Sequence, residues 1–282
     1  MKLMYYPGCT LKKNAIDYEK SSLAVLKKLG FNIEELSKWY CCGATFGLII
    51  DELVKHLGAY RTLVKAQIQS RTSGTRDLLV LCPFCYNVLK RVGKLLAEDA
   101  ESYHRITKYA DDEEPYRFGI NVLHFIEVIY SNLDKLTKAI NNRIDDVKIA
   151  VYYGCSIVRP KNIAVDNAEN PTIIEKIIEA IGAEPVNYPL KTDCCGSYQI
   201  LIDKNIVYSN SNRILESIPR DTDLVVTICP LCYYNLRETT SCFEKKFKHI
   251  RIAYFSEVLA YAMGLEEYVS NEILWVFKEK IQ

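Results

Sequence analysis

The sequence predicts an α/β fold made of two similar halves, each with a parallel or mixed sheet. Two observations lead to this prediction. The same cysteine motifs occur twice in the same order, and short apolar runs alternate with amphipathic helical patterns. Strands that alternate with helices are typical of sheets covered by helices on their faces. We expect the two half-domains to be homologous and to be related by a pseudo-twofold axis.

The duplication is visible in three cysteine motifs and in a fourth motif without cysteine. A lone Cys comes first, followed by Cys-Cys-Gly and then by Cys-Pro-x-Cys. The paired segments, first half and then second, are 5–9 and 152–155, 41–43 and 194–196, 81–87 and 228–235, and 124–128 and 254–258. A repeated order of motifs indicates a duplicated structural unit.

The predicted secondary structure follows the same repeat. A 3.6-residue apolar period predicts a helix over 53–68. Asn170, Pro171 and Gly182 predict the N-cap, the first position and the end of another helix. Four short β-rich runs are expected to lead into cysteine motifs as strands: Lys2–Tyr6, Leu78–Leu81, Val147–Tyr153 and Leu224–Ile228.

The boundary between the halves is predicted in the polar stretch 137–146. This places an N-terminal domain at 1–142 and a C-terminal domain at 143–282. The segment between the last cysteine and the fourth motif is longer in the first half. We therefore predict a surface insertion at about 98–117, which contains the acidic stretch 111–115.

Composition excludes several classes of function. The 282 residues are 49% apolar and 25% charged, with a net charge of +1, so there is no electrostatic case for nucleic acid or for an anionic membrane surface. No apolar run reaches the roughly 18 residues of a spanning helix, and the segment 1–9 lacks the layout of a secretory signal. We expect a cytoplasmic protein without direct membrane insertion.

Eleven cysteines require an explanation, and a disulfide framework is a poor one. Reducing compartments disfavour disulfides, and chains of this size do not need them. The count is odd, and both Cys41–Cys42 and Cys194–Cys195 are adjacent pairs, which do not easily reach relaxed disulfide geometry. Metal or cluster ligation is the better interpretation.

Five thiols in each half exceed the four ligands of tetrahedral zinc or of an ordinary cluster. Either one cysteine per half is spare, or the metal centre is larger than usual. No histidine lies near a cysteine motif, and a repeated five-thiol set does not fit a thioredoxin-like dithiol. Ligand softness favours iron–sulfur clusters, with zinc in one or both sites as the alternative. The chain has no dinucleotide fingerprint and no P-loop, so its electrons need an outside supplier.

The double pattern resembles the cysteine-rich CCG domain, which occurs twice in the B subunit of heterodisulfide reductase. The resemblance extends over essentially the whole chain. Beyond the cysteines it is carried by the segments 5–11, 39–44, 152–155 with 159–160, 168–172, 182–186 and 191–196.

The resemblance implies two CCG half-domains, each of which binds a non-cubane [4Fe-4S] cluster through five cysteines. The clusters themselves, through these ligands, would be the catalytic groups. One set of ligands would be Cys9, Cys41, Cys42, Cys82 and Cys85, and the other Cys155, Cys194, Cys195, Cys229 and Cys232.

The same resemblance implies a function. The family's B subunit reduces the mixed disulfide of coenzyme M and coenzyme B, a reaction of methanogenesis, with the substrate bound between the clusters. The expected partners are the ferredoxin-like C subunit and the flavin-bearing A subunit of a heterodisulfide reductase complex.

Two alternatives stay open at this point. The chain could be an electron-transfer or anchoring CCG subunit of another complex, resembling archaeal succinate dehydrogenase or a sulfur-oxidation assembly. It could also be a zinc-stabilised scaffold. The segment between Cys42 and Cys82 is long for the family, and Ser156–Val158 replaces a more apolar pair, so the identity of the disulfide is less certain than cluster binding.

A few other residues attract attention. Cys242 has no counterpart in the repeat and is predicted to be an incidental or buried thiol. Glu127 and Glu257 are predicted to complement helix dipoles rather than to take part in chemistry. The basic residues beside the cysteine loops are expected to be mostly solvated charges that could attract an anionic substrate, namely Lys12, Lys13, Arg159 and Lys191.

Overall fold

The computed structural model describes residues 1–44 and 52–281. It contains two four-stranded sheets, and neighbouring strands in both of them pair in parallel. The strand order is β2-β1-β3-β4 in the first sheet and β6-β5-β7-β8 in the second. The strands are β1 (Lys2–Tyr6), β2 (Asn32–Glu35), β3 (Asp77–Val80), β4 (Asn121–His124), β5 (Lys148–Tyr152), β6 (Glu184–Val186), β7 (Leu224–Thr227) and β8 (Ile252–Tyr254).

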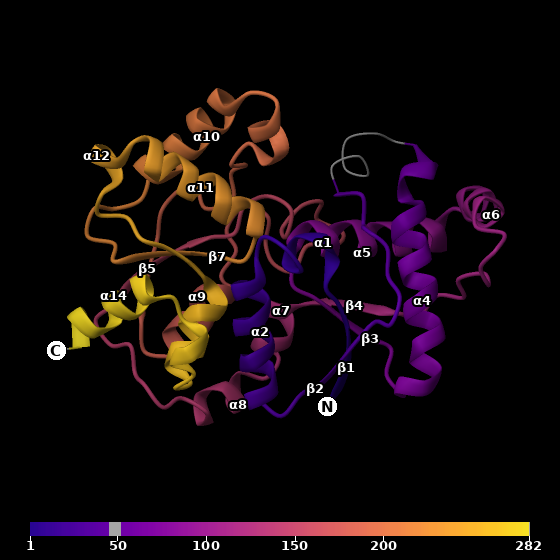
Figure 1. The fold of residues 1–282 in the computed structure, drawn as a ribbon, viewed down its shortest axis with the longest axis horizontal. Coiled ribbons are helices and arrows are strands. Elements are labelled where there is room, and N and C mark those ends of the chain that lie inside the picture. The colour runs from indigo at the N-terminus through magenta and orange to yellow at the C-terminus, as the bar shows by residue number, and fades with distance from the viewer. Residues whose placement is uncertain (45–51, 282) are drawn as a thin grey trace. The chain divides into compact units, whose positions relative to one another are not determined.

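Helices connect and follow these strands (Figure 1). Those in the first half of the chain are α1 (Gly8–Leu11), α2 (Ile16–Lys28), η1 (Leu53–His56), α4 (Leu57–Ser73), α5 (Pro83–Glu98), α6 (Ala100–Tyr109), α7 (Phe125–Tyr130) and α8 (Leu133–Lys138). Those in the second half are α9 (Ile173–Ala180), η2 (Ser197–Leu201), α10 (Lys204–Glu216), α11 (Pro230–Cys242), α12 (Glu244–Phe247), α13 (Phe255–Ala262), η3 (Glu266–Tyr268) and α14 (Asn271–Ile281).

The predicted α/β class with a parallel sheet in each half is therefore confirmed. The predicted strands match β1, β3, β5 and β7 to within one residue, because each is a short run of buried apolar side chains. The predicted helix over 53–68 is present as η1 and α4. None of the helices in the described ranges is long and apolar enough to cross a membrane.

One helix start is placed wrongly by the sequence pattern. α9 begins at Ile173 with Thr172 as its N-cap, so Asn170 is not the cap and Pro171 is not the first helical residue. The carboxylate of Asp166 accepts hydrogen bonds from the backbone N–H groups of Thr172 and Ile173, at 2.5 and 2.8 Å. A capping side chain from outside the local pattern replaces the predicted one.

The chain forms two compact units that do not follow the sequence order throughout. Unit 1 comprises Met1–Asn14 and Gly30–Phe125, and unit 2 comprises Ala15–Leu29 and Ile126–Gln282. The boundary between 142 and 143 and the pseudo-twofold relation stay predictions about the duplicated sequence unit.

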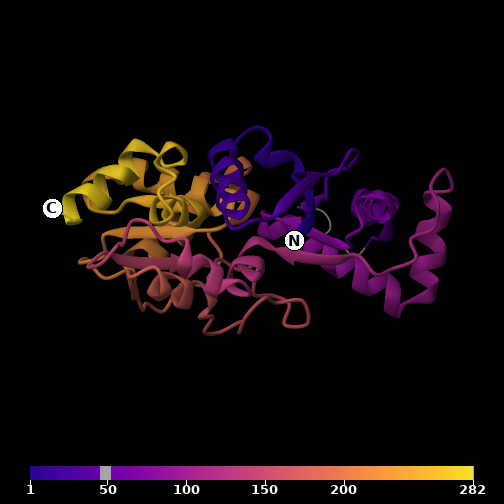
Figure 2. The same cartoon turned by 90° about the horizontal axis from the view of Figure 1, so that it is seen from below.

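The helix α2 explains this division, because it packs within unit 2 although it lies between β1 and β2 in the sequence. Tyr18 stacks on Tyr254 with 4.6 Å between ring centroids, and Ser21 shares a buried 2.6 Å hydrogen bond with Ser256 at the start of α13. Both views show α2 beside the C-terminal helices (Figures 1 and 2).

The predicted insertion contributes α6 and an acidic loop to unit 1. The loop is tied to α4 by ion pairs of 2.6 Å between Arg61 and Asp112 and between Arg71 and Glu114. Exposed pairs of this kind each contribute little to stability. That the segment is an insertion relative to the second half stays a prediction.

The register of the strands decides where the cysteine motifs lie. In the first sheet Tyr6 at the end of β1 pairs with Val80 at the end of β3, and in the second Tyr152 pairs with Thr227 in the same way. Because the strands are parallel, their carboxyl ends lie at one edge of each sheet, which is where open α/β sheets place their sites.

Candidate metal centres

Three cysteine loops meet at the carboxyl edge of each sheet. In unit 1 Cys9 lies in α1 directly after β1, the Cys41–Cys42 pair follows β2, and Cys82 and Cys85 open α5 after β3. Unit 2 repeats this arrangement after β5, β6 and β7 with Cys155, Cys194, Cys195, Cys229 and Cys232. The structure thus brings the predicted ligands of each half to one place, while their role as ligands stays a prediction.

Several of these thiols are close to one another without being bonded. All eleven cysteines are free, and a disulfide would require about 2.0 Å between sulfurs. The Sγ–Sγ separations are 3.8 Å for Cys9 and Cys41, 3.4 Å for Cys42 and Cys85, and 3.7 Å for Cys195 and Cys232.

Each site has a buried side and an open side. In unit 1 Cys42, Cys82 and Cys85 are buried, whereas Cys9 and Cys41 are exposed. In unit 2 the counterparts of the three buried thiols are again buried, whereas Cys194 is exposed and Cys155 is half-buried. Three thiols are therefore held in the protein interior, and two border solvent.

Crowding changes the proton affinity of the thiols. Hydrogen bonds between Cys42 and the thiols of Cys41 and Cys85 lower the pKa of Cys42 to about 5. A hydrogen bond from Cys155 lowers the pKa of Cys194 to about 6. The pKa of Cys85 is raised above its usual range, first because of its hydrogen bond with Cys42 and next because of that with Cys82. At least one thiol in each site is thus ready to lose its proton, as metal ligation requires.

Glycine permits the close approach of the loops. Gly8 and Gly154 have φ of +68° and +67°, in the left-handed region. A Cβ at these positions would lie only 3.1 Å from Cys85 Sγ and 3.0 Å from Cys232 Sγ, respectively. Any side chain would therefore fill the space beside the sulfur, where a bulky inorganic core needs room.

Two tyrosines hold the Cys-Cys-Gly loops. Tyr6 donates from its hydroxyl to the carbonyl of Tyr40 at 2.9 Å, and Tyr152 donates to the carbonyl of Asp193 at 2.7 Å. Each acceptor precedes the first cysteine of its pair, so the two bonds are equivalent in the repeat. Burial raises the pKa of both phenols. They therefore remain protonated and serve as donors.

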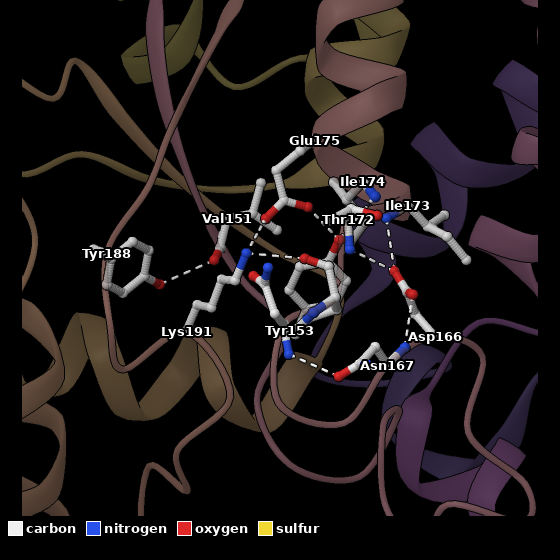
Figure 3. A network of polar contacts seen from close by, with 12 residues as sticks. Val151, Tyr153, Asp166, Asn167, Thr172, Ile173, Ile174, Glu175, Tyr188 and Lys191 are labelled. Atoms are coloured by element: carbon white, nitrogen blue, oxygen red, sulfur yellow. Dashed lines mark hydrogen bonds and ion pairs between the residues drawn. The ribbon is translucent and has the colours of Figure 1, made fainter.

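Unit 2 adds a buried ion pair behind its cysteine loops. Lys191 is only 6% exposed, and its ammonium group donates to Glu175 Oε1 at 2.8 Å and to the carbonyl of Pro171 at 2.9 Å. Tyr153 donates to the other oxygen of Glu175. Figure 3 shows these side chains converging on Glu175.

The same network joins two cysteine loops through the backbone. The carbonyl of Lys191 accepts from the N–H groups of Tyr153 and Gly154, at 3.0 and 3.2 Å. The Cys194–Cys195 loop is thereby fixed to the turn that carries Cys155. The buried ammonium group of Lys191 is tolerated because the carboxylate of Glu175 neutralises its charge.

The donor set fits a polynuclear centre better than a single ion. Each edge offers five thiols on three loops, beside a glycine that leaves space. A single tetrahedral ion takes four ligands. Soft thiolates in this number suit an iron–sulfur centre.

The basic residues beside the cysteine loops, and the cysteine that has no counterpart in the repeat, have different environments. Lys12 and Lys13 are exposed as expected, with Lys12 paired to Glu35 at 2.7 Å. The expectation of solvated charge is wrong for Lys191, which the ion pair keeps buried. Cys242 is an exposed thiol at the end of α11.

Tyr6, Tyr152 and Asn235 contact the sites in ways that the sequence did not predict. The amide of Asn235 donates to Cys195 Sγ at 3.2 Å. The only signal available was position, because all three residues lie inside the repeated motifs.

Comparison with known proteins places the chain in a class. The model of the cysteine-rich domain family, CCG, matches residues 3–90 and 149–237, which is more than half of the chain. The chain therefore belongs to the CCG cysteine-rich domain family and carries two copies of the domain. The predicted resemblance to the B subunit of heterodisulfide reductase is confirmed by full-length relatives.

Three relatives illustrate the range of this similarity. The chain is 27% identical to the 8-methylmenaquinol:fumarate reductase membrane anchor subunit of Wolinella succinogenes, over 93% of this chain and 92% of the relative. It is 25% identical to a protein of Archaeoglobus profundus that is named as similar to the B subunit of heterodisulfide reductase, over 94% and 92%. It is 26% identical to the B subunit of the ferredoxin/F420H2-dependent CoB-CoM heterodisulfide reductase of Methanosarcina acetivorans, over 93% and 89%.

A solved structure supports the fold alone. A hypothetical protein from Helicobacter pylori superposes with a TM-score of 0.70 at 12% identity, over 93% of this chain. The chain spans about half of that protein, with 49% covered.

Proposed function

We propose that this chain is the iron–sulfur B subunit of a heterodisulfide reductase-type complex, in which it reduces a disulfide at two non-cubane [4Fe-4S] clusters. The observation that carries the proposal is the duplicated five-thiol edge, with three thiols inside the protein and two at its surface. Family membership and the named relatives support a redox role.

The ten repeated cysteines would hold the two clusters. When bound, these clusters supply single electrons and iron atoms with affinity for sulfur. Reduction of a disulfide consumes two electrons and two protons and releases two thiols. Two centres that each supply one electron would provide the two electrons. The ligands are Cys9, Cys41, Cys42, Cys82 and Cys85 in unit 1, and Cys155, Cys194, Cys195, Cys229 and Cys232 in unit 2.

The remaining site residues position these ligands. Gly8 and Gly154 leave space beside a sulfur, and Tyr6 and Tyr152 fix the Cys-Cys-Gly loops. The exposed thiols leave one side of each site accessible to a small sulfur compound. We infer that this compound is a mixed disulfide such as CoM-S-S-CoB, because relatives of similar length are named as B subunits of CoB-CoM heterodisulfide reductases. A ferredoxin-like C subunit and a flavin-bearing A subunit would deliver the electrons.

Metal analysis and one pair of variants test the cluster assignment. Chain purified without oxygen should contain iron and acid-labile sulfide at both sites. Cys85→Ser should remove about half of the iron, whereas Cys242→Ser, at the exposed cysteine outside the repeat, should remove none. Zinc alone at both sites would contradict the proposal and favour a scaffold.

A turnover assay tests the reaction. With a reduced viologen dye as donor and the partner subunits present, the loaded chain should convert CoM-S-S-CoB to two thiols. Cys85→Ser and Cys232→Ser should each abolish turnover, because two electrons are needed and one centre remains. Intact clusters without any turnover would contradict disulfide reduction.

A second candidate is an electron-transfer or anchoring subunit of another redox complex. The 27% identity with the membrane anchor subunit of a fumarate reductase, over nearly the full length, favours it. In this case the loaded chain should co-purify with a flavoprotein that reduces fumarate and should leave CoM-S-S-CoB unchanged.

A further inference from the structure

Asn235 lies beside the second thiol set without being a candidate ligand. It is in the first turns of α11, three residues after Cys232, and its side chain is completely buried. Its Nδ2 is 3.2 Å from Cys195 Sγ and 2.9 Å from the carbonyl oxygen of Ser197. A neutral amide in this position requires an explanation, because it packs against the sulfur of a predicted cluster ligand.

The surroundings fix the orientation of the amide. The Ser197 carbonyl can only accept a hydrogen bond, so the amide nitrogen and not the oxygen must face it. The same nitrogen then directs its second N–H at Cys195 Sγ. Both donors of Asn235 are therefore used, one for the loop after Cys-Cys-Gly and one for the thiol.

The amide oxygen shows that this placement is not made for stability alone. Asn235 Oδ1 is buried and has no hydrogen-bond partner within the described ranges 1–44 and 52–281. A buried acceptor without a partner destabilises a fold. Proteins leave buried polar atoms unsatisfied mainly at functional sites.

Unit 1 also has a buried asparagine after its last cysteine, at a different spacing. Asn87 follows Cys85 by two residues and is 1% exposed, whereas the residue three positions after Cys85 is Val88. The two sites therefore share their thiols and differ in the spacing of the asparagine that follows them.

We propose that Asn235 is a positioning residue that acts through Cys195 and raises the reduction potential of the centre in unit 2. The inference rests on the proposed function, since it requires a redox centre on these thiols. An added electron increases the negative charge on the ligand sulfurs, and a hydrogen bond to a more negative acceptor is stronger. The N–H···S contact thus stabilises the reduced state more than the oxidised state, and hydrogen bonds to sulfurs are a recognised determinant of cluster potentials.

Potentiometric titration of the full chain tests this inference. The Cys85→Ser background isolates the centre of unit 2, and dithionite supplies one electron to it while electron paramagnetic resonance monitors reduction. Asn235→Leu removes both donors, and Asn235→Asp keeps the shape but replaces the donor with an acceptor. Each should lower the reduced-to-oxidised ratio about tenfold at a given potential, a shift of about 59 mV for one electron.

Two controls separate this effect from a structural one. Asn205→Asp makes the same charge change at an exposed position and should leave the potential unchanged. In a Cys232→Ser background, which isolates the centre of unit 1, the Asn235 variants should also have no effect. Iron and sulfide per chain should equal those of the parent.

A spectroscopic measurement does not depend on the folding of a variant at this position. Chain with Asn at position 235 and labelled with side-chain 15N-asparagine, in the Cys85→Ser background, should show a 15N hyperfine coupling to the reduced centre. Loaded centres with no coupling, or with a potential that both substitutions leave unchanged, would overturn the inference alone. A chain that never holds iron and sulfide would overturn the proposed function and the inference together.

Discussion

The two thiol sites share their framework and differ in what surrounds it. In both, a glycine in the left-handed region lies against the last cysteine of the set, and a buried tyrosine holds the carbonyl before the Cys-Cys pair. In both, three thiols are buried and at least one is exposed. Features that determine where the sulfurs lie are therefore present twice.

The supporting residues have diverged. Lys191 is buried in an ion pair, whereas Lys38, which occupies the matching position three residues before Cys41, is exposed. Trp39 packs edge-on against Tyr6 in unit 1, with 5.7 Å between ring centroids. The same arrangement of cysteines is therefore compatible with polar neighbouring residues in unit 2 and with aromatic ones in unit 1.

The largest expected difference concerns the two lysines. Lys191→Met leaves the carboxylate of Glu175, which is only 14% exposed, without a cationic partner and should lower the free energy of unfolding by about 3 kcal/mol. Lys38→Met should change it by less than about 0.5 kcal/mol, as is usual for a surface position. Urea unfolding of the metal-free chain, followed by circular dichroism, measures both. Equal effects would show that the ion pair does not distinguish the units. The double variant Lys191→Met with Glu175→Leu should recover much of the loss.

The glycines should be equally sensitive in the two units. Gly8→Ala and Gly154→Ala combine strain in the left-handed region with a clash against sulfur, and should each cost about 2–4 kcal/mol. Each should also halve the iron bound after reconstitution. Gly74→Ala is the control, since Gly74 has φ of +72° but nothing within 4 Å of its Cβ position. It should cost about 1–2 kcal/mol and retain all iron, so iron loss in this variant would assign the effect to strain.

Acid should affect unit 1 through a residue that unit 2 lacks. His124, which matches Tyr254 in the repeat, is buried and lies 2.7 Å from the carbonyl of Leu81. Burial lowers the pKa of His124 from 6.5 to about 3. The unfolded chain therefore takes up a proton below pH 6.5 while the folded chain does not, and stability falls as the pH falls from 6.5 toward 3.

The expected slope is about 1.4 kcal/mol per pH unit, or about 2 kcal/mol between pH 6.5 and 5. His124→Phe should remove this slope even if it lowers stability overall, whereas His249→Gln, at an exposed position, should keep it. Urea titrations at several pH values measure the slope. An unchanged slope in His124→Phe would show that other groups cause the acid sensitivity.

The smallest effect is expected for the tyrosines. Tyr6→Phe and Tyr152→Phe each remove one hydrogen bond to a loop carbonyl and should each cost about 1 kcal/mol. The two losses should agree within experimental error, because the bonds are equivalent in the repeat. Urea unfolding of the metal-free chain measures them. A clearly larger loss in one unit would mean that the phenols do not have the same role.

Much of the fold could be predicted because its signals are local. β1 and β3 are short apolar runs that end immediately before a cysteine motif, and the motif order reveals the duplication. Each parallel sheet then places the cysteine loops of its own unit at one edge. The thiols of one unit lie close together because their loops follow neighbouring parallel strands. The repeated motifs indicate this arrangement in the sequence.

The supports of the sites could not be predicted, since they depend on contacts distant in sequence. Lysine is a residue type that is usually exposed, and only the pairing of Lys191 with Glu175 in α9 allows Lys191 to be buried. Asp166 caps α9 from outside the local pattern. The same reason explains why the assignment of α2 to unit 2 escaped sequence analysis.

The position of α2 has a consequence for the synthesis of the protein. The hydrogen bond of Ser21 can form only after Ser256 has been synthesised, and Ser256 is 235 residues further along the chain. At about 5–20 residues per second this delay is roughly 10–50 s, during which α2 lacks its contacts with α13 and η3. A gene divided between codons 142 and 143 would separate α2 from the helices it packs on. Neither product alone could complete unit 2, so the two products would have to associate before α2 could reach these helices.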